Sequence, residues 1–198
     1  MSALLRLLRE DLKAARAQDP AARNDLEVAL AYSGVHAIWA YRIAHALWQR
    51  PPFRPAARLL SQLARFVTGV EIHPGARIGR RPFIDHGSEI VIGETTVMGD
   101  DIMMYQGTTV GGRTLQVPFH REERRHAIIG DRVMLGAGCR IIGPLTIGDD
   151  TAIGANAVVV RDVPADSIAI GMPAVHRHKD SDYPLDPRTD LIDPAVLL

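Results

Sequence analysis

The stretch IGDRVMLGAGCRIIGPLTIGDDTAIGANAVV, residues 129–159, has an aliphatic residue at every sixth position. Glycine directly follows four of these six aliphatic residues. Neither an α-helix nor an alternating strand sustains a period of six. Such a repeat is typical of a parallel β-helix, in which short strands turn a corner and stack on the coil below. The aliphatic residues would fill the interior, and Gly and Asp would permit the tight corners.

The same period is present upstream, at positions 72, 78 and 84 and again at 92, 98, 104 and 110. Two irregularities interrupt it. The spacing of eight between Ile84 and Ile92 predicts a small insertion in one coil. The repeat is then lost between Val110 and Ile129, which predicts an excursion loop at 111–128. Binding loops commonly leave a stiff scaffold in this way.

The first part of the chain has a helical period instead. Leucines recur at helical spacing from Leu4 to Leu12, and Asp19 before Pro20 is the predicted N-cap of a second helix. Further helices are predicted over 35–49 and 55–67. We therefore predict an α+β fold with three parts: a helical N-terminal domain (1–68), a left-handed parallel β-helix (69–175) and a C-terminal tail (176–198).

Composition excludes several classes of protein. The 198 residues contain 23 Lys+Arg and 23 Asp+Glu, so the net charge is zero and nucleic acid is not an expected partner. The single Cys139 excludes an intrachain disulfide and is interpreted as structural. No apolar run reaches membrane-spanning length, which predicts a cytoplasmic protein that does not enter a membrane.

Several motifs together resemble the bacterial serine acetyltransferase family, in its short form. They are GVEIHPGARIGRRPFIDHGSEIVIGET (69–95), TTVGG (108–112), Arg125-His126, and the helical stretches DPAAR (19–23) and LEVALAYSGVHAIWAYRIAHALW (26–48). The resemblance covers roughly residues 5–175. It implies a hexapeptide-repeat acyltransferase that assembles as homotrimers or as hexamers of paired trimers. The implied reaction moves the acetyl group of acetyl-CoA to the hydroxyl of L-serine, giving O-acetylserine for cysteine biosynthesis.

The resemblance also implies roles for individual residues. His86 would be the general base, since imidazole titrates near neutral pH, and Glu71 would orient it from a neighbouring coil. Asp19, Asp85 and Arg125 would bind the ammonium and carboxylate groups of serine. His126 would contact the substrate or the tetrahedral intermediate.

The co-substrate acetyl-CoA is expected along a groove between neighbouring solenoids, where small residues let it approach the main chain. No metal and no acyl-enzyme nucleophile is expected. The candidate cofactor-binding residues are Gly111, Gly112, Gly136, Ala137, Gly154 and Ala155.

The excursion loop departs from the family pattern. It reads GGRTLQVPFHREERRHA, about five residues longer than usual, and lacks the proline that normally follows the histidine. Another hydroxyl acceptor, such as homoserine or an amino acid of secondary metabolism, is therefore an alternative. His120 is an alternative to His126 within the loop.

Two other functions stay open. A zinc enzyme resembling the γ-type carbonic anhydrases needs three converging ligands, for which His73, His86 and His126 are the candidates. A non-catalytic trimeric scaffold is the other. The apolar terminus at Leu198 suggests O-acetylserine sulfhydrylase as a partner of the tail, because family members often insert a C-terminal isoleucine into that enzyme.

Overall fold

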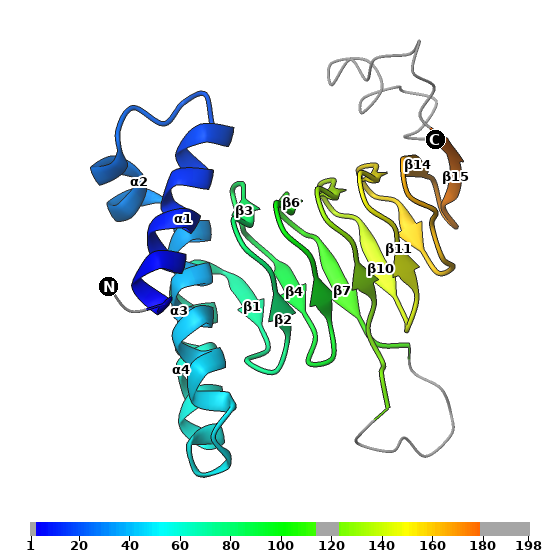
Figure 1. The fold of residues 1–198 in the computed structure, drawn as a ribbon. Coiled ribbons are helices and arrows are strands. Elements are labelled where there is room, and N and C mark those ends of the chain that lie inside the picture. Colours follow the sequence, from blue (N-terminus) through cyan, green and yellow to red (C-terminus); the bar gives the residue numbers. More distant parts are fainter. Residues whose placement is uncertain (1–2, 114–122, 179–198) are drawn as a thin grey trace.

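The computed structural model describes residues 3–113 and 123–178, which form four α-helices followed by a stack of short strands (Figure 1). The helices are α1 (Ala3–Gln18), α2 (Asp25–Ala31), α3 (Ser33–Trp48) and α4 (Arg54–Thr68), with a 3-10 turn at Pro51–Phe53. The strands are β1 (Val70–Ile72), β2 (Arg77–Ile78), β3 (Phe83–Ile84), β4 (Ile90–Ile92), β5 (Val97–Met98), β6 (Met103–Met104), β7 (Thr109–Gly111), β8 (Ile128–Ile129), β9 (Met134–Leu135), β10 (Arg140–Ile142), β11 (Thr146–Ile147), β12 (Ala152–Ile153), β13 (Val158–Val159), β14 (Ser167–Ile170) and β15 (Val175–His178).

The strands form three sheets that wrap one solenoid. Sheet A has the order β1-β4-β7-β10-β13, sheet B β11-β8-β5-β2 and sheet C β15-β14-β12-β9-β6-β3. Every pairing is parallel except β14 with β15, which is antiparallel. Each of the first four coils contributes one strand to each sheet, so the solenoid has three edges, which we name the A–B, B–C and C–A corners. The predicted parallel β-helix behind a helical N-terminal region is confirmed.

The interior is filled by the residues of the six-residue repeat. All thirteen aliphatic positions of the repeat are buried, among them Met104, Val110, Leu135 and Ile147, which are fully enclosed. Cys139 is also fully buried, and burial raises the pKa of its thiol to about 12. It is therefore a packing residue, as the sequence suggested.

The register of sheet A shows where the chain leaves the coil. Val91 pairs with Thr109, one ordinary coil later, whereas Thr109 pairs with Arg140, which lies 31 positions further along the chain. The extra residues leave the solenoid after β7 and return at β8, on the A–B corner. The predicted excursion is present, and half of it, residues 114–122 with His120, lies outside the described residues.

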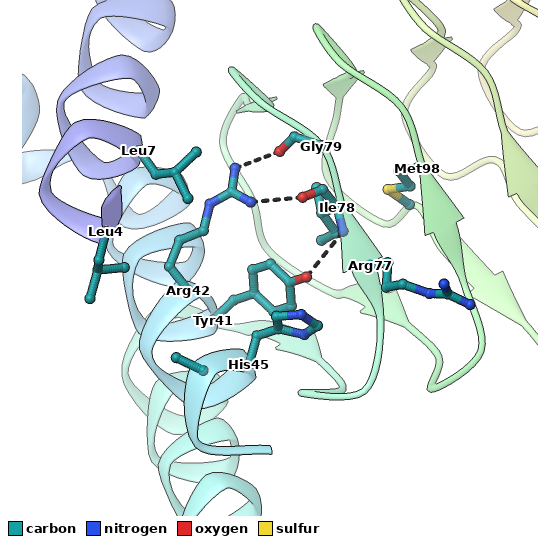
Figure 2. Close-up of a pocket in the computed structure, with 10 residues that line it drawn as sticks. Leu4, Leu7, Tyr41, Arg42, His45, Arg77, Ile78, Gly79 and Met98 are labelled. Atoms are coloured by element: carbon teal, nitrogen blue, oxygen red, sulfur yellow. Dashed lines mark hydrogen bonds between the residues drawn. The ribbon is translucent and has the colours of Figure 1, made fainter. Parts of the chain in front are cut away.

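The helices α1, α3 and α4 pack on the first coil of the solenoid. Arg42 of α3 forms a buried ion pair with Asp11 of α1, at 3.1 Å. Figure 2 shows the hydrogen bonds that Arg42 also donates to the backbone carbonyls of Ile78 and Gly79. Tyr41 accepts a hydrogen bond from the Ile78 N–H and donates one to a carbonyl in the same coil. Breaking a buried pair of this kind leaves an uncompensated charge, so these contacts fix the helices against the β-helix.

The start of α2 differs from the prediction. Its N-cap is Asn24, whose side chain accepts a hydrogen bond from the Glu27 N–H, and not Asp19. Asp19 instead accepts from the Ala21 N–H in a turn that follows α1. Pro20 therefore ends one helix without beginning the next. None of the helices in the described part of the chain is long and apolar enough to cross a membrane.

Candidate functional site

His86 stands on a widened C–A corner between β3 and β4. The two extra residues between Ile84 and Ile92 produce a turn with positive φ at His86 (59°), Gly87 and Glu89. The left-handed region is unfavourable for a residue with a Cβ, so the fold holds His86 there against its preference. The Ser33 hydroxyl donates to the His86 carbonyl, and 72% of the imidazole side chain is exposed.

A cavity of about 240 Å³ lies between this corner and the start of α3, with Asp19, Tyr32, Asp85 and His86 in its lining. The Asp85 carboxylate is 3.8 Å from the His86 Nε2. The Tyr32 hydroxyl donates to Asp19 Oδ2 at 2.5 Å. That bond holds the pKa of Asp19 below its usual value and raises the pKa of Tyr32 to about 12. The cavity thus presents two carboxylates and an imidazole, a set suited to an ammonium group and a hydroxyl proton.

Glu71 does not contact His86 in the described chain. It points outward from the middle of β1 and pairs with Arg65 of α4 at 3.2 Å. Glu71 and His86 also belong to the same coil, not to stacked coils as expected, because one coil here spans about twenty residues. The expected support of His86 by Glu71 is therefore not present in this arrangement, in which Glu71 pairs with Arg65.

Arg125 and His126 form a second cluster on the A–B corner, where the excursion rejoins the coil. Arg125 pairs with Glu94 at 2.6 Å. The Thr95 hydroxyl lies 2.8 Å from His126 Nδ1. The His126 ring is largely buried and lies over Gly93, where an added Cβ would overlap it. Burial, reinforced by the Arg125 charge and opposed by Glu94, lowers the pKa of His126.

The two clusters lie at opposite ends of sheet A. Asp85 and His86 precede β4, whereas Glu94, which holds Arg125, follows it. The three residues of β4 span about 10 Å. Within one chain, the structure therefore brings Asp19, Asp85 and His86 together but does not bring Arg125 and His126 to them.

The cofactor candidates are also divided between two corners. Gly111 and Gly112 lie beside the Arg125–His126 cluster on the A–B corner, and the other four lie on the C–A corner above His86. A Cβ at Gly136 would meet the backbone of the next coil, and one at Gly154 would meet Ile170, so coil stacking explains both glycines. Ala137 and Ala155 are half-exposed one coil apart, where the Asn156 N–H donates to the Ala137 carbonyl. Their small side chains leave a shallow surface on the C–A corner, which extends along the coil stack from His86.

The six-residue repeat is matched by a family model. Residues 126–161 match the family described as bacterial transferase hexapeptide (six repeats). Over 163 residues, the chain is 53% identical to a serine acetyltransferase of Helicobacter pylori, which covers 82% of this chain and 92% of the relative. The chain belongs to the serine acetyltransferase family.

Solved structures of the family superimpose well. The Neisseria gonorrhoeae serine acetyltransferase in complex with serine has a TM-score of 0.80 at 38% identity, covering 87% of this chain and 68% of that one. A serine acetyltransferase in complex with CoA has a TM-score of 0.79 at 35% identity, covering 88% of this chain and 70% of that one.

Family membership does not by itself identify three residues that the sequence analysis left without a role. Tyr32 holds Asp19, and Glu94 and Thr95 hold Arg125 and His126. For Glu94 and Thr95, the signal in the sequence is the GET motif at residues 93–95. Their function depends on a contact about thirty residues away, which no local pattern reports.

The zinc alternative has no support within one chain. Among the described residues, no group of three or more His, Cys, Asp or Glu side chains is arranged to hold a metal ion. His86 is on the C–A corner, whereas His73 and His126 are on the A–B corner. The His73 Nδ1 already accepts a hydrogen bond from the Gly75 N–H at 2.9 Å.

Proposed function

We propose that this protein transfers the acetyl group of acetyl-CoA to the hydroxyl of L-serine, with His86 as the general base. The observation that carries the proposal is the widened corner, which presents an exposed imidazole beside Asp85 in a cavity shared with Asp19. The kinship with enzymes solved in complex with serine and with CoA supports both substrates. The product would be O-acetylserine, the acetylated precursor used in cysteine biosynthesis.

The chemistry follows from the groups in the cavity. Asp19 and Asp85 would bind the serine ammonium group, leaving the hydroxyl at His86. His86 accepts the hydroxyl proton as the oxygen attacks the thioester carbonyl, and returns it to the sulfur when the carbon–sulfur bond breaks. The proton and the acetyl group are therefore both accounted for, and no covalent acyl-enzyme intermediate is needed. Glu71 would stabilise the protonated His86 after release from Arg65.

A complete site needs a second copy of the chain. The residues proposed for the serine carboxylate and the intermediate, Arg125 and His126, lie on the A–B corner, away from His86. The A–B corner of one copy placed against the C–A corner of the next would join the clusters. Contact between two different surface patches is heterologous, and it forms a closed ring when the rotation between copies returns to the start. The three-edged solenoid fits a cyclic homotrimer.

The same arrangement supports acetyl-CoA in the groove between copies. Ala137 and Ala155 provide a low surface on one wall, and Gly112, which is exposed, lies on the other. An added Cβ at Gly112 would approach Arg125 and His126 no closer than 3.5 Å. The residues present fit an extended pantetheine arm that ends at His86. Gly111, Gly136 and Gly154 would contribute backbone only.

Pairing of trimers is supported by the helices. The face of α4 turned away from the solenoid leaves Leu59, Leu63, Phe66 and Val67 exposed. A contiguous apolar stripe of this kind favours association, and a second trimer would cover it. A cytoplasmic location and a sulfhydrylase partner for the tail remain predictions, and residues 179–198 of the tail lie outside the described residues.

The test is CoA release from acetyl-CoA by the purified protein, with serine, homoserine and threonine as acceptors. We expect serine-dependent release, and a loss of about 100- to 10,000-fold in kcat for His86→Asn. Asparagine tolerates the left-handed backbone, so the fold should persist. His178→Asn, an exposed histidine on β15, is the matched control. Activity with homoserine alone would favour the alternative acceptor; no release with any acceptor would favour the scaffold.

A further inference from the structure

Three consecutive residues hold the Arg125–His126 pair from the preceding coil. Gly93 leaves room for the His126 ring, and Glu94 pairs with the Arg125 guanidinium. Thr95 contacts His126 through both its backbone and its side chain. Of the three, Thr95 alone hydrogen-bonds to the imidazole ring of His126.

The hydrogen bonds around the Thr95 hydroxyl determine its direction. Its oxygen accepts from the Arg125 N–H at 2.9 Å and from the His126 N–H at 3.1 Å. These two donors occupy both lone pairs of the hydroxyl, which leaves only its hydrogen to share. The atom within reach of that hydrogen is His126 Nδ1, at 2.8 Å. The hydroxyl therefore donates to the ring.

A second donor reaches the same ring atom. The Thr95 backbone N–H also points at His126 Nδ1, at 3.3 Å. A hydrogen on Nδ1 would face two donors and no acceptor, so Nδ1 must be the unprotonated nitrogen. A neutral imidazole carries one hydrogen, which consequently resides on Nε2. Protonation of both nitrogens is disfavoured for the same reason, in the direction in which burial already lowers the pKa.

We propose that Thr95 is a positioning residue that fixes His126 as a neutral hydrogen-bond donor through Nε2. His126 then donates to the oxyanion that develops as the thioester is attacked, while His86 moves the proton. In the described chain, Nε2 has no hydrogen-bond partner, so its N–H is available to a ligand. A preorganised donor of this kind stabilises the transition state without reorganisation. The oxyanion role rests on the proposed function, and the tautomer does not.

The tautomer is tested by nitrogen-15 NMR of the intact protein, with the His126 signals assigned by their loss in His126→Asn. We expect hydrogen on Nε2 and none on Nδ1 at pH 8, where the ring is neutral. The charged and titratable groups facing the ring are Glu94, Arg125 and His73. Hydrogen on Nδ1 in the wild-type protein would overturn the inference, whatever the activity.

The role of Thr95 is tested with Thr95→Val, which keeps the shape and removes the hydroxyl, and Thr95→Ser, which restores it. We expect Thr95→Val to lower kcat for serine about 10- to 100-fold with little change in KM. The Nδ1–H form should become partly populated, because only the longer backbone contact at 3.3 Å then opposes it. The Thr95→Ser variant should keep kcat within about threefold of the wild-type value. Thr146→Val, an exposed threonine on β11, is the matched control. Wild-type kcat and tautomer in Thr95→Val would refute the role of Thr95. If the wild-type protein does not acetylate serine, the proposed function fails while the NMR result for His126 still stands.

Discussion

His86 and His126 lie at opposite ends of the strands of sheet A. His86 is on the C–A corner that precedes β4, and His126 is on the A–B corner, against the residues that follow β4. The stiffness of the parallel coil stack keeps them apart, because each corner is hydrogen-bonded to the coils on either side. A single chain cannot close around one substrate with both histidines. Assembly of copies is thus part of the proposed active site.

This separation predicts complementation between two inactive variants. His86→Asn and His126→Asn should each lose most activity alone. The two variants are unfolded and refolded together in equal amounts. A site is then intact only when its His86 comes from a His126→Asn chain and its His126 from a His86→Asn chain. In a cyclic trimer this occurs at about one site in four.

The measurement is CoA release from the co-refolded mixture, compared with each variant refolded alone and with wild type refolded in the same way. Recovery of about a quarter of wild-type activity supports the composite site. If the mixture shows only the summed activity of the two variants, both histidines serve within one chain and the proposed assembly is wrong.

The contact between Tyr32 and Asp19 predicts a change in serine binding. Tyr32→Phe removes the hydroxyl that donates to the carboxylate, so Asp19 becomes free to turn from the cavity. We expect KM for serine to rise about three- to tenfold, since a hydrogen bond to a charged but solvent-exposed group is partly screened. Steady-state kinetics at varied serine provides the measurement.

In an Asp19→Asn background, the same Tyr32→Phe change should have a much smaller effect, because the charged acceptor is gone. An equal effect in both backgrounds would show that Tyr32 acts without Asp19. KM for acetyl-CoA is the internal control, because neither residue is among those proposed to contact it.

Gly34 should be intolerant of a side chain. It lies at the start of α3, where an added Cβ would overlap the Ile84 carbonyl of the first coil. Gly34→Ala must push the helix from the solenoid, at a cost of about 1 to 3 kcal/mol in the free energy of unfolding. Thermal unfolding by circular dichroism gives the comparison. Gly112→Ala, whose added Cβ would make only ordinary van der Waals contacts at 3.5 Å, should leave the melting temperature unchanged. Equal melting temperatures for both variants would contradict the close packing at Gly34.

Acid should destabilise the protein through His73. Burial first, and the Arg58 charge second, lower the pKa of His73 from 6.5 to about 4. The unfolded chain therefore binds a proton at a pH where the folded chain does not. The stabilisation is full above pH 6.5 and is lost as the pH falls toward 4.

Urea unfolding at pH 7 and pH 5 measures this dependence. His73→Gln cannot take up the proton and should flatten the slope between these pH values. The Trp48 ring packs edge-on against His73, so some loss of stability at both pH values is expected. If the stability of His73→Gln falls between pH 7 and pH 5 as steeply as that of wild type, another group causes the pH dependence, and His126 is the first candidate.

The sequence alone determined the solenoid, because a six-residue aliphatic period has one structural solution and each repeat buries its own residue. It also located the two irregularities, the widened corner at His86 and the excursion. Motif resemblance supplied the residues of the site, yet it placed Glu71 beside His86, where the structure pairs it with Arg65. The Asp19-Pro20 pair predicted a helix cap at Asp19, which was wrong, because local sequence does not distinguish a cap from a turn.

Only the tertiary structure decided which residues meet. Tyr32 reaches Asp19, and Thr95 reaches His126 across 31 positions, because helix docking and coil stacking bring remote segments together. It also decided that His86 and His126 stay apart within one chain. Local periodicity fixes which residues turn inward, whereas the partner of an outward side chain depends on coil register and on what packs against it.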